Sequence, residues 1–339
     1  MQALILQQPG KINLGPVPSP QLSPGDVLLR VRMVGLCGTD LNSYRGKNPL
    51  VSYPRIPGHE ISAEIMEATA GVPAAFTPGT PVTLSPYTAC GRCASCRRSR
   101  PNACQFNETL GVQRDGALTE FIKVPWQKLL LAPSLTAQEL CLVEPLTVGF
   151  HAAARGRVTV EDTVAILGCG AVGLGAVAGA AERGARVIAV DVDDAKLALA
   201  KRAGATETIN SRTEDRHARL SELTEGRGPD VVIEAIGLPE TFRAAVEEVA
   251  FTGRVVYIGY AKEQVAYETR LFVQKELDIL GSRNALVEDF AAVIQMLAKR
   301  SFPLEALISR IVTLPDAPDA FAEWAANPAA TSKILVQIS

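Results

Sequence analysis

The sequence has no excess of charge of either sign and no long apolar run. Its 339 residues include 34 lysines and arginines against 36 aspartates and glutamates, a net charge of -2, which leaves no basic footprint for nucleic acid or an acidic membrane. The longest apolar stretch, near residues 171–181, falls short of the roughly 20 residues that a membrane span needs. The N-terminus, MQALILQQPG, lacks the basic region and apolar core of a signal peptide. We therefore expect a cytoplasmic protein with no nucleic acid or membrane partner.

Histidine is scarce, with three residues, whereas cysteine, with seven, is not. In a reducing compartment these thiols stay available to metals. Four of them follow the spacing C-x2-C-x2-C-x7-C, which suits a closed tetrahedral zinc site: Cys90, Cys93, Cys96 and Cys104. Four thiolates leave no position for water or substrate, so we expect a structural zinc that fixes a lobe of residues 86–110. Four arginines lie around these cysteines: Arg92, Arg97, Arg98 and Arg100. We expect them to be exposed to solvent on a loop, which is the usual place of such a basic run.

The chain is long enough for two domains, because single hydrophobic cores stop growing at about 250–300 residues. The first part has Pro- and Gly-rich turns and strand-like alternation, clearest at Val27, Leu29, Val31 and Met33, which indicates a β-rich domain. After about Pro145, strands and helices alternate, which predicts an α/β fold with a doubly wound parallel sheet. Beyond about Gly281 an amphipathic helix leads to a final strand, KILVQIS.

A glycine-rich loop follows the first strand of the predicted parallel sheet. The motif G-x-G-x-x-G is weak by itself, but here it lies between an apolar strand at 163–167 and a helix, so that backbone N–H groups can face a pyrophosphate. The residues expected to bind the cofactor in this loop are Gly168, Gly170, Val172 and Gly173. Asp191 ends the second strand, where a carboxylate binds ribose hydroxyls and repels a 2′-phosphate. The pattern predicts NAD in preference to NADP.

A second group of possible metal ligands is dispersed along the chain, as Cys37, His59, Glu60 and Glu144. A thiolate, an imidazole and carboxylates are plausible zinc ligands. Each residue also has an ordinary explanation, since Cys37 would serve as a buried apolar residue and Glu144 as a carboxylate at a helix start before Pro145. Residue type alone leaves both interpretations open.

Together these motifs resemble the medium-chain zinc-dependent dehydrogenases, and within them the sorbitol and sugar-acid dehydrogenase branch. The resemblance runs the whole length and rests on GLCGTD, PGHE, the four-cysteine lobe, EPLTVGFHA and GCGAVGLGA with Asp191, all in the family's order. It implies a GroES-like catalytic domain at residues 1–145 and 285–339, a Rossmann NAD-binding domain at 146–284, and an active site in the cleft between the two domains.

The resemblance also implies roles for single residues. Cys37 and His59 would be ligands of a catalytic zinc, the second of two zinc ions per subunit, and Glu60 and Glu144 would complete or exchange in that site. Thr39 would pass on the proton of the alcohol, although a turn hydroxyl that caps the helix start is an alternative. Asn42 departs from the family, where a histidine often stands, and asparagine cannot titrate near neutrality. The proton would then leave through water, the cofactor ribose or Glu60.

Arg283 lies in GSRNALVEDF, a segment similar to that of galactonate or gulonate dehydrogenases. It could bind a sugar-acid carboxylate through two hydrogen bonds or lie at a domain interface. The sequence thus predicts an NAD-dependent oxidoreductase for a secondary hydroxyl of a polyol or sugar acid, with a homodimer or homotetramer paired through an edge strand near GRVVYIGY. The alternatives are an L-threonine or 2,3-butanediol dehydrogenase and a catalytically silent nucleotide-binding regulatory protein. A silent protein has no need to keep an open metal site.

Overall fold

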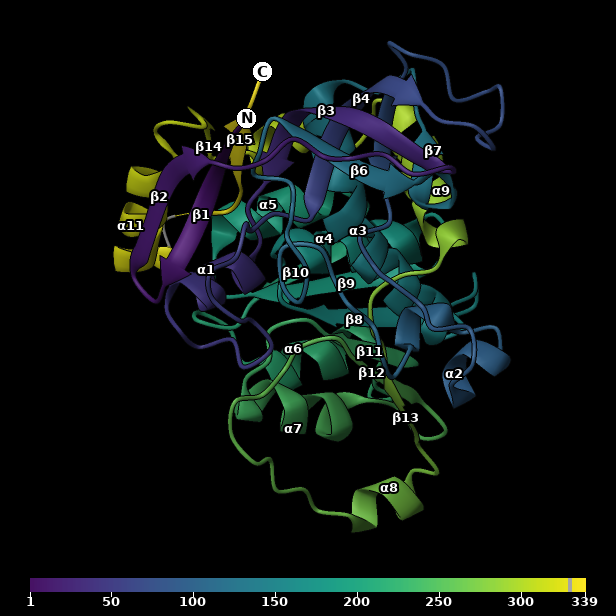
Figure 1. The fold of residues 1–339 in the computed structure, drawn as a ribbon. Helices are drawn as coiled ribbons and strands as arrows, with labels where there is room; N and C mark the ends of the chain where they lie inside the picture. The colour runs from purple at the N-terminus through teal and green to yellow at the C-terminus, as the bar shows by residue number, and fades with distance from the viewer. Residues whose placement is uncertain (329–330) are drawn as a thin grey trace. The chain divides into compact units, whose positions relative to one another are not determined.

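The computed structural model describes residues 1–328 and 331–339, and the chain divides into two compact units. The first unit comprises residues 1–144, 286–300 and 304–339, and the second comprises 145–285 and 301–303. Figure 1 shows the course of the chain through them. Within the described residues, no helix is both long and apolar enough to cross a membrane.

The first unit is built on a largely antiparallel sheet with strand order β14-β15-β3-β4-β5-β7, in which β6 also pairs with β3. A separate hairpin is formed by β1 (Gln2–Gln8) and β2 (Lys11–Pro16). The strands of the larger sheet are β3 (Asp26–Gly35), β4 (Glu60–Ala68), β5 (Pro81–Leu84), β6 (Phe121–Pro125), β7 (Leu129–Leu131), β14 (Arg310–Thr313) and β15 (Ile334–Gln337).

Strand β3 lies at the centre of this unit, and its predicted alternation is confirmed. Val27, Leu29 and Val31 are fully buried, because one face of the strand packs into the core with Phe321. The last strand, β15, pairs antiparallel with β3 and places Val336 opposite Val34. The C-terminal segment thereby completes the first unit.

The helices of the first unit are short, apart from α9 and α11. They are α1 (Gly38–Tyr44), α2 (Ala94–Arg97), η1 (Pro101–Ala103), η2 (Trp126–Lys128), α9 (Val287–Ala298), α10 (Leu304–Leu307) and α11 (Ala317–Ala326). Helix α3 (Ala137–Arg155) runs across the boundary between the units and contains Pro145 in its interior. The suggestion that Glu144 stands at a helix start is therefore wrong, since the helix begins at Ala137, in spite of the hydrogen bond that an interior proline removes.

The second unit is a parallel sheet with strand order β10-β9-β8-β11-β12-β13, which confirms the predicted doubly wound sheet. Helices α4 and α5 cover one face, and α6 and α7 cover the other (Figure 1). The strands are β8 (Thr163–Leu167), β9 (Arg186–Asp191), β10 (Glu207–Asn210), β11 (Val231–Glu234), β12 (Arg254–Tyr257) and β13 (Asp278–Gly281). The helices are α4 (Ala171–Ala181), α5 (Asp194–Arg202), α6 (Arg216–Leu223), α7 (Pro239–Glu248) and α8 (Arg270–Gln274).

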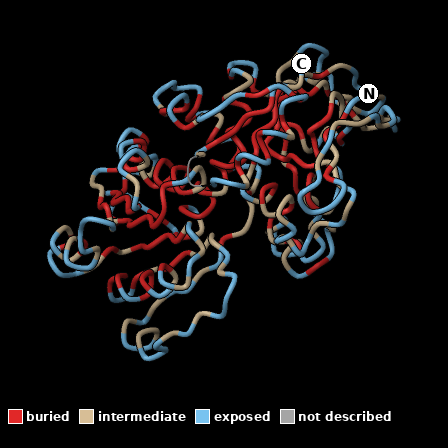
Figure 2. Tube along the Cα trace, turned by 90° about the vertical axis from the view of Figure 1, so that its left-hand side faces the viewer, coloured by how far each residue is buried: buried red, intermediate tan, exposed pale blue. Residues whose placement is uncertain are grey.

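Burial follows the strands of each sheet. In Figure 2 the central strands are buried along their length, whereas the connecting loops are exposed. Strand β12, the GRVVYIGY segment, is an inner strand, because β13 pairs with it on its outer side. The edge strand expected near GRVVYIGY is therefore β13, on which Ile279 is 41% exposed.

Candidate metal centres and nucleotide site

The four predicted thiolates come together in one group. The ligand atoms of Cys90, Cys93, Cys96 and Cys104 all lie within 4.8 Å of one another. The Sγ atom of Cys93 is 3.4 Å from that of Cys96 and 3.9 Å from that of Cys104. A tetrahedron with Zn–S bonds of about 2.3 Å has S···S edges of roughly 3.8 Å, so the donor set fits a zinc ion.

Local backbone geometry holds these thiolates. The N–H of Cys90 donates to the Sγ of Cys104 at 3.3 Å, and the N–H of Cys93 donates to the Sγ of Cys90 at 3.3 Å. Hydrogen bonding to Ser95, helped by backbone N–H groups, lowers the pKa of Cys93 to about 5. Such bonds favour the thiolate form that zinc requires.

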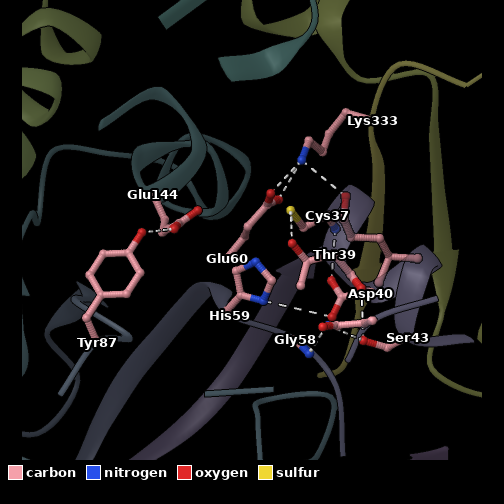
Figure 3. A network of polar contacts seen from close by, with 12 residues as sticks. Cys37, Thr39, Asp40, Ser43, Gly58, His59, Glu60, Tyr87, Glu144 and Lys333 are labelled. Carbon is pink, nitrogen blue, oxygen red and sulfur yellow. Dashed lines mark hydrogen bonds and ion pairs between the residues drawn. The ribbon is translucent and has the colours of Figure 1, made fainter. Parts of the chain in front are cut away.

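The second group unites residues that are far apart in the sequence. The ligand atoms of Cys37, His59 and Glu60 also lie within 4.8 Å of one another. Cys37 precedes α1, and His59 directly precedes Glu60, the first residue of β4 (Figure 3). Glu60 pairs with Gly35 of β3, and a side chain at Gly35 would collide with the Glu60 carboxylate. The pairing of β3 with β4 therefore fixes the position of the Glu60 carboxylate in this group.

Asp40 fixes two of the three members of this group. Its Oδ2 accepts from the N–H of Cys37 at 2.9 Å, and its Oδ1 accepts from the N–H of Gly58 at 3.2 Å and lies 3.8 Å from Nδ1 of His59. Figure 3 shows the other ring nitrogen of His59 turned toward Cys37 and Glu60. A carboxylate behind a ligating histidine is a common support of zinc sites.

Lys333 binds the third member. Its Nζ donates to both carboxylate oxygens of Glu60 at 2.7 Å and to the carbonyl oxygen of Leu36 at 3.1 Å, and both charged side chains are almost completely buried (Figure 3). Burial lowers the pKa of Lys333, but the negative charges of Glu60 and Cys37 outweigh it, so that the pKa ends above its usual value. The site is thus a concentration of buried negative charge, which suits a divalent cation.

Glu144 lies beside this group and accepts a hydrogen bond from the hydroxyl of Tyr87 (Figure 3). Burial raises the pKa of Glu144, although the charge of His59 opposes the change. Burial also lowers the pKa of His59, but Asp40 and Cys37 outweigh it and raise the pKa well above its usual value. Both pKa values are therefore raised, and the raised pKa of His59 reflects the carboxylate and the thiolate that lie around its imidazole.

Thr39 lies in the first turn of α1, behind the N-cap residue Cys37, with its Oγ1 3.6 Å from the Sγ of Cys37. The alternative in which Thr39 caps the helix start is therefore wrong. Of the other two histidines, His151 is 4% exposed and packed in α3, whereas the His217 side chain is 78% exposed.

The glycine loop has the predicted form. It follows β8 at once, Gly170 is the N-cap of α4, and Gly168 has a φ of +97°. A side chain at Gly173 would meet the carbonyl oxygen of Gly168 at 1.8 Å, so only glycine fits there. The loop lies at β8, where the strand order reverses between β8 and β11, and such switch points are where parallel sheets bind ligands.

Asp191 ends β9 and connects this loop with the next turn. Its Oδ2 accepts from the N–H of Cys169 at 2.7 Å, and its Oδ1 accepts from Val192 at 2.8 Å and Asp193 at 3.1 Å. Arg283 is half-buried and comes two residues after β13, at the carboxyl edge of the same parallel sheet.

Glu234, which sequence reasoning missed, is fully buried at the end of β11. Its Oε1 accepts from the N–H groups of Ile236 at 2.9 Å and Gly237 at 2.7 Å, and from the hydroxyl of Thr241 at 2.7 Å. It holds the β11–α7 loop, whose Ile236 approaches Gly168 closely. A buried acidic residue in an otherwise apolar strand, VVIE, was the available signal.

Asp40, Lys333 and Tyr87 were also missed. Asp40 stands three residues after Cys37, which is the spacing of a capping carboxylate and could have been noticed. Lys333 and Tyr87 gave no comparable signal, because their partners lie 273 and 57 residues away.

A sheet domain split by a parallel nucleotide-type sheet, together with these ligand groups, defines a class of metal- and nucleotide-dependent oxidoreductases. Residues 23–134 match the alcohol dehydrogenase GroES-like domain, and residues 171–299 match the zinc-binding dehydrogenase family. Both matches agree with the predicted fold class, a GroES-like domain with a Rossmann domain.

Two relatives and one solved structure are similar over most of their length. A sorbitol dehydrogenase of Bacillus subtilis is 36% identical over 83% of this chain and 81% of its own. The L-galactonate-5-dehydrogenase of Escherichia coli is 31% identical over 91% of each chain. The crystal structure of the alcohol dehydrogenase RspB of Escherichia coli CFT073 with NADH has a TM-score of 0.89 and 30% identity, over 99% of each chain. The chain belongs to the zinc-type alcohol dehydrogenases and is an oxidoreductase that uses a nicotinamide cofactor.

Proposed function

We propose that this protein uses NAD to oxidise a secondary hydroxyl of a polyol or sugar acid to a ketone, at a zinc held by Cys37 and His59. The observation that carries the proposal is the grouping of these two residues with Glu60, with their ligand atoms within 4.8 Å. The relatives named for sorbitol and L-galactonate support the substrate class. They do not favour a threonine or butanediol dehydrogenase, or a silent nucleotide-binding protein.

The donor set fits a zinc ion with an open position, because three protein ligands leave room for a substrate oxygen. When bound, zinc would polarise the substrate hydroxyl so that its oxygen loses a proton, and the nicotinamide would accept the hydride from the carbon that bears this oxygen. Glu144 would complete or exchange in this site, and Asp40 would keep the ring of His59 oriented.

Thr39 would pass on the substrate proton, since its hydroxyl lies 3.6 Å from the Sγ of Cys37. Among the three onward routes, Glu60 is the weakest acceptor, because Lys333 donates to both of its carboxylate oxygens. Asn42 cannot titrate, so the proton would leave through water or the cofactor ribose.

The preference for NAD rests on Asp191. Asp191 is buried, and three backbone N–H groups hold its carboxylate in place, so the carboxylate cannot easily turn away from a 2′-phosphate. The second zinc would lie among the four cysteines. A cytoplasmic location is still a prediction from the sequence.

A homodimer would form at β13, the terminal strand of the parallel sheet. Its outer edge lacks a partner strand among the described residues, and Ile279 on it is 41% exposed. Ile279→Lys should shift the protein to the monomer in light scattering, whereas an unchanged mass would place the interface elsewhere. A homotetramer would need a further interface.

The experiment is NADH formation by zinc-loaded protein with sorbitol, xylitol, galactitol, L-galactonate, L-gulonate, L-idonate, L-threonine and 2,3-butanediol. We expect turnover with polyols or sugar acids and at least tenfold less with the last two. If the substrates are acids, Arg283→Ala should abolish the preference, and Arg270→Ala, on the exposed helix α8, should keep it. Turnover restricted to L-threonine or butanediol, or none at all, would overturn the proposal.

The cofactor is tested by the ratio of kcat/KM for NAD and NADP. The wild-type protein should favour NAD, and Asp191→Ala should reduce that preference by about tenfold or more, the worth of roughly 1.4 kcal/mol. A wild-type preference for NADP would contradict the assignment.

A further inference from the structure

The four-cysteine lobe and the Cys37, His59 and Glu60 group belong to the same compact unit, and Tyr87 connects the base of the lobe with Glu144, which lies beside the second group. Tyr87 stands three residues before Cys90, at the start of the lobe. Its backbone forms an antiparallel bridge with Thr109, five residues beyond Cys104. The base of the lobe is therefore closed at the position of Tyr87.

Further contacts fasten this base. The N–H of Leu110 donates to the carbonyl oxygen of Pro86 at 3.1 Å, and the N–H of Glu108 donates to the hydroxyl of Thr88 at 2.7 Å. Lys128 donates to the carbonyl oxygen of Tyr87 at 2.6 Å. The backbone of Tyr87 is thus set by the two ends of the lobe and by one lysine.

The side chain of Tyr87 points toward Glu144 (Figure 3). Tyr87 is 6% exposed, and its hydroxyl donates to Oε1 of Glu144. Its ring meets the ring of Phe290 edge-on, with 6.5 Å between the centroids. Packing and one hydrogen bond leave the hydroxyl little freedom. The direction of the Glu144 carboxylate is thereby tied to the base of the lobe.

We propose that Tyr87 is a positioning residue for Glu144, and that the cysteine lobe acts on the neighbouring metal site through it. The proposal rests on the proposed metal site, in which Glu144 completes or exchanges with the ligands. Partners of ligating groups typically change metal affinity by about 10–100-fold when removed. The lobe then has a second role, because its folding fixes the position of Tyr87 and so of Glu144 at the site of Cys37, His59 and Glu60. We call this second site the open site.

The test uses Tyr87→Phe, which removes only the hydroxyl, and Tyr44→Phe as the matched control. Tyr44 belongs to the same unit, and its ring packs on Phe321 at 5.6 Å. Zinc affinity of the more weakly held site is measured by competition with a chelator, and its ligand field by the visible spectrum after exchange with cobalt. Turnover is recorded separately.

Tyr87→Phe should weaken zinc binding at the open site by about 10–100-fold and change the cobalt spectrum, with the cysteine-bound zinc retained. Tyr44→Phe should match the wild type. Wild-type affinity and spectrum in folded Tyr87→Phe would overturn the positioning role.

Thr88→Ala tests the link to the lobe and replaces Tyr87→Phe if that variant fails to fold. It removes the 2.7 Å bond between Glu108 and Thr88 at the base, without touching Glu144. We expect it to weaken zinc binding at the open site in the wild-type background, and to have no further effect in Tyr87→Phe. An equal loss in both backgrounds, or none in either, would overturn the coupling.

These readouts are separate from the proposed reaction. If no substrate is turned over and Tyr87→Phe still changes the zinc affinity and the spectrum, the proposed function fails and the coupling stands. If substrates are turned over and Tyr87→Phe binds zinc as the wild type does, the coupling alone fails.

Discussion

The two ligand groups of the first unit are assembled in different ways. In the lobe, four thiolates come from residues 90–104, and their supporting hydrogen bonds come from backbone N–H groups of the same segment. In the other group, Cys37 and His59 come from different segments, and the supporting charge of Lys333 lies 273 residues from Glu60. The first group is a local structure, whereas the second depends on the whole sheet.

The two groups also differ in charge. The described contacts of the cysteine group involve neutral donors such as Ser95 and backbone N–H groups. The other group contains the buried charges of Asp40, Glu60 and Lys333. A buried charge destabilises the fold when its partner is removed. Substitutions of charged residues should therefore affect the Cys37, His59 and Glu60 group and leave the cysteine group largely unchanged.

The largest effect should come from removing one ligand of either group. Cys37→Ser should lower turnover by about 10³-fold or more, because several kcal/mol of metal assistance is lost, while the melting temperature changes little. Cys104→Ser, at a fully buried thiolate, should instead lower the melting temperature most, since structural zinc contributes to folding. Initial rates measure the turnover, and thermal unfolding measures the melting temperature. Equal losses of turnover and of melting temperature in both variants would contradict the distinction between a catalytic and a structural zinc.

Lys333→Met should destabilise the fold by about 3–5 kcal/mol, because it leaves the Glu60 carboxylate buried without its partner. Lys47→Met, at an exposed position, should change the free energy of unfolding by less than about 0.5 kcal/mol. Urea unfolding measures both. Equal stabilities for the two variants would show that the buried ion pair does not support this group.

Asp40→Asn should weaken zinc binding at the Cys37 group by about 10–100-fold, or roughly 1.4–2.7 kcal/mol, because the carboxylate behind His59 loses its charge. Chelator competition measures the affinity. The cysteine zinc should be unaffected, and a loss from the lobe instead would contradict the separation of the two groups.

The smallest effect is expected from the arginines of the lobe. Arg97 is exposed and donates to the carbonyl oxygen of Arg92 at 2.9 Å. Arg97→Ala should change the free energy of unfolding by less than about 0.5 kcal/mol and retain the lobe zinc. A loss of metal in this variant, measured by elemental analysis, would mean that charge does hold the lobe.

The same contrast explains what the sequence could predict. The cysteine spacing and the glycine loop are local, and each appears in the structure where its pattern indicated. Alternation in β3 correctly separated its buried from its exposed face. These features depend on neighbours within about one element, so residue order suffices.

Features that depend on distant pairing were missed. Lys333 reaches Glu60 because β15 returns to pair with β3, and nothing in KILVQIS indicates that return. An edge strand was expected near GRVVYIGY, but only the sheet order shows that this segment, β12, is an inner strand and that its neighbour β13 is the edge. Glu144 was assigned a possible helix start because proline usually marks one, whereas α3 accommodates Pro145 in its interior.

Zinc content per chain, measured by mass spectrometry of the metal together with turnover, tests the two-centre account most directly. We expect two zinc ions per chain in the wild-type protein and one in Cys37→Ser, which should fold but have a turnover lowered by about 10³-fold or more. A single zinc in the wild type, or full zinc content and unchanged turnover in Cys37→Ser, would contradict it.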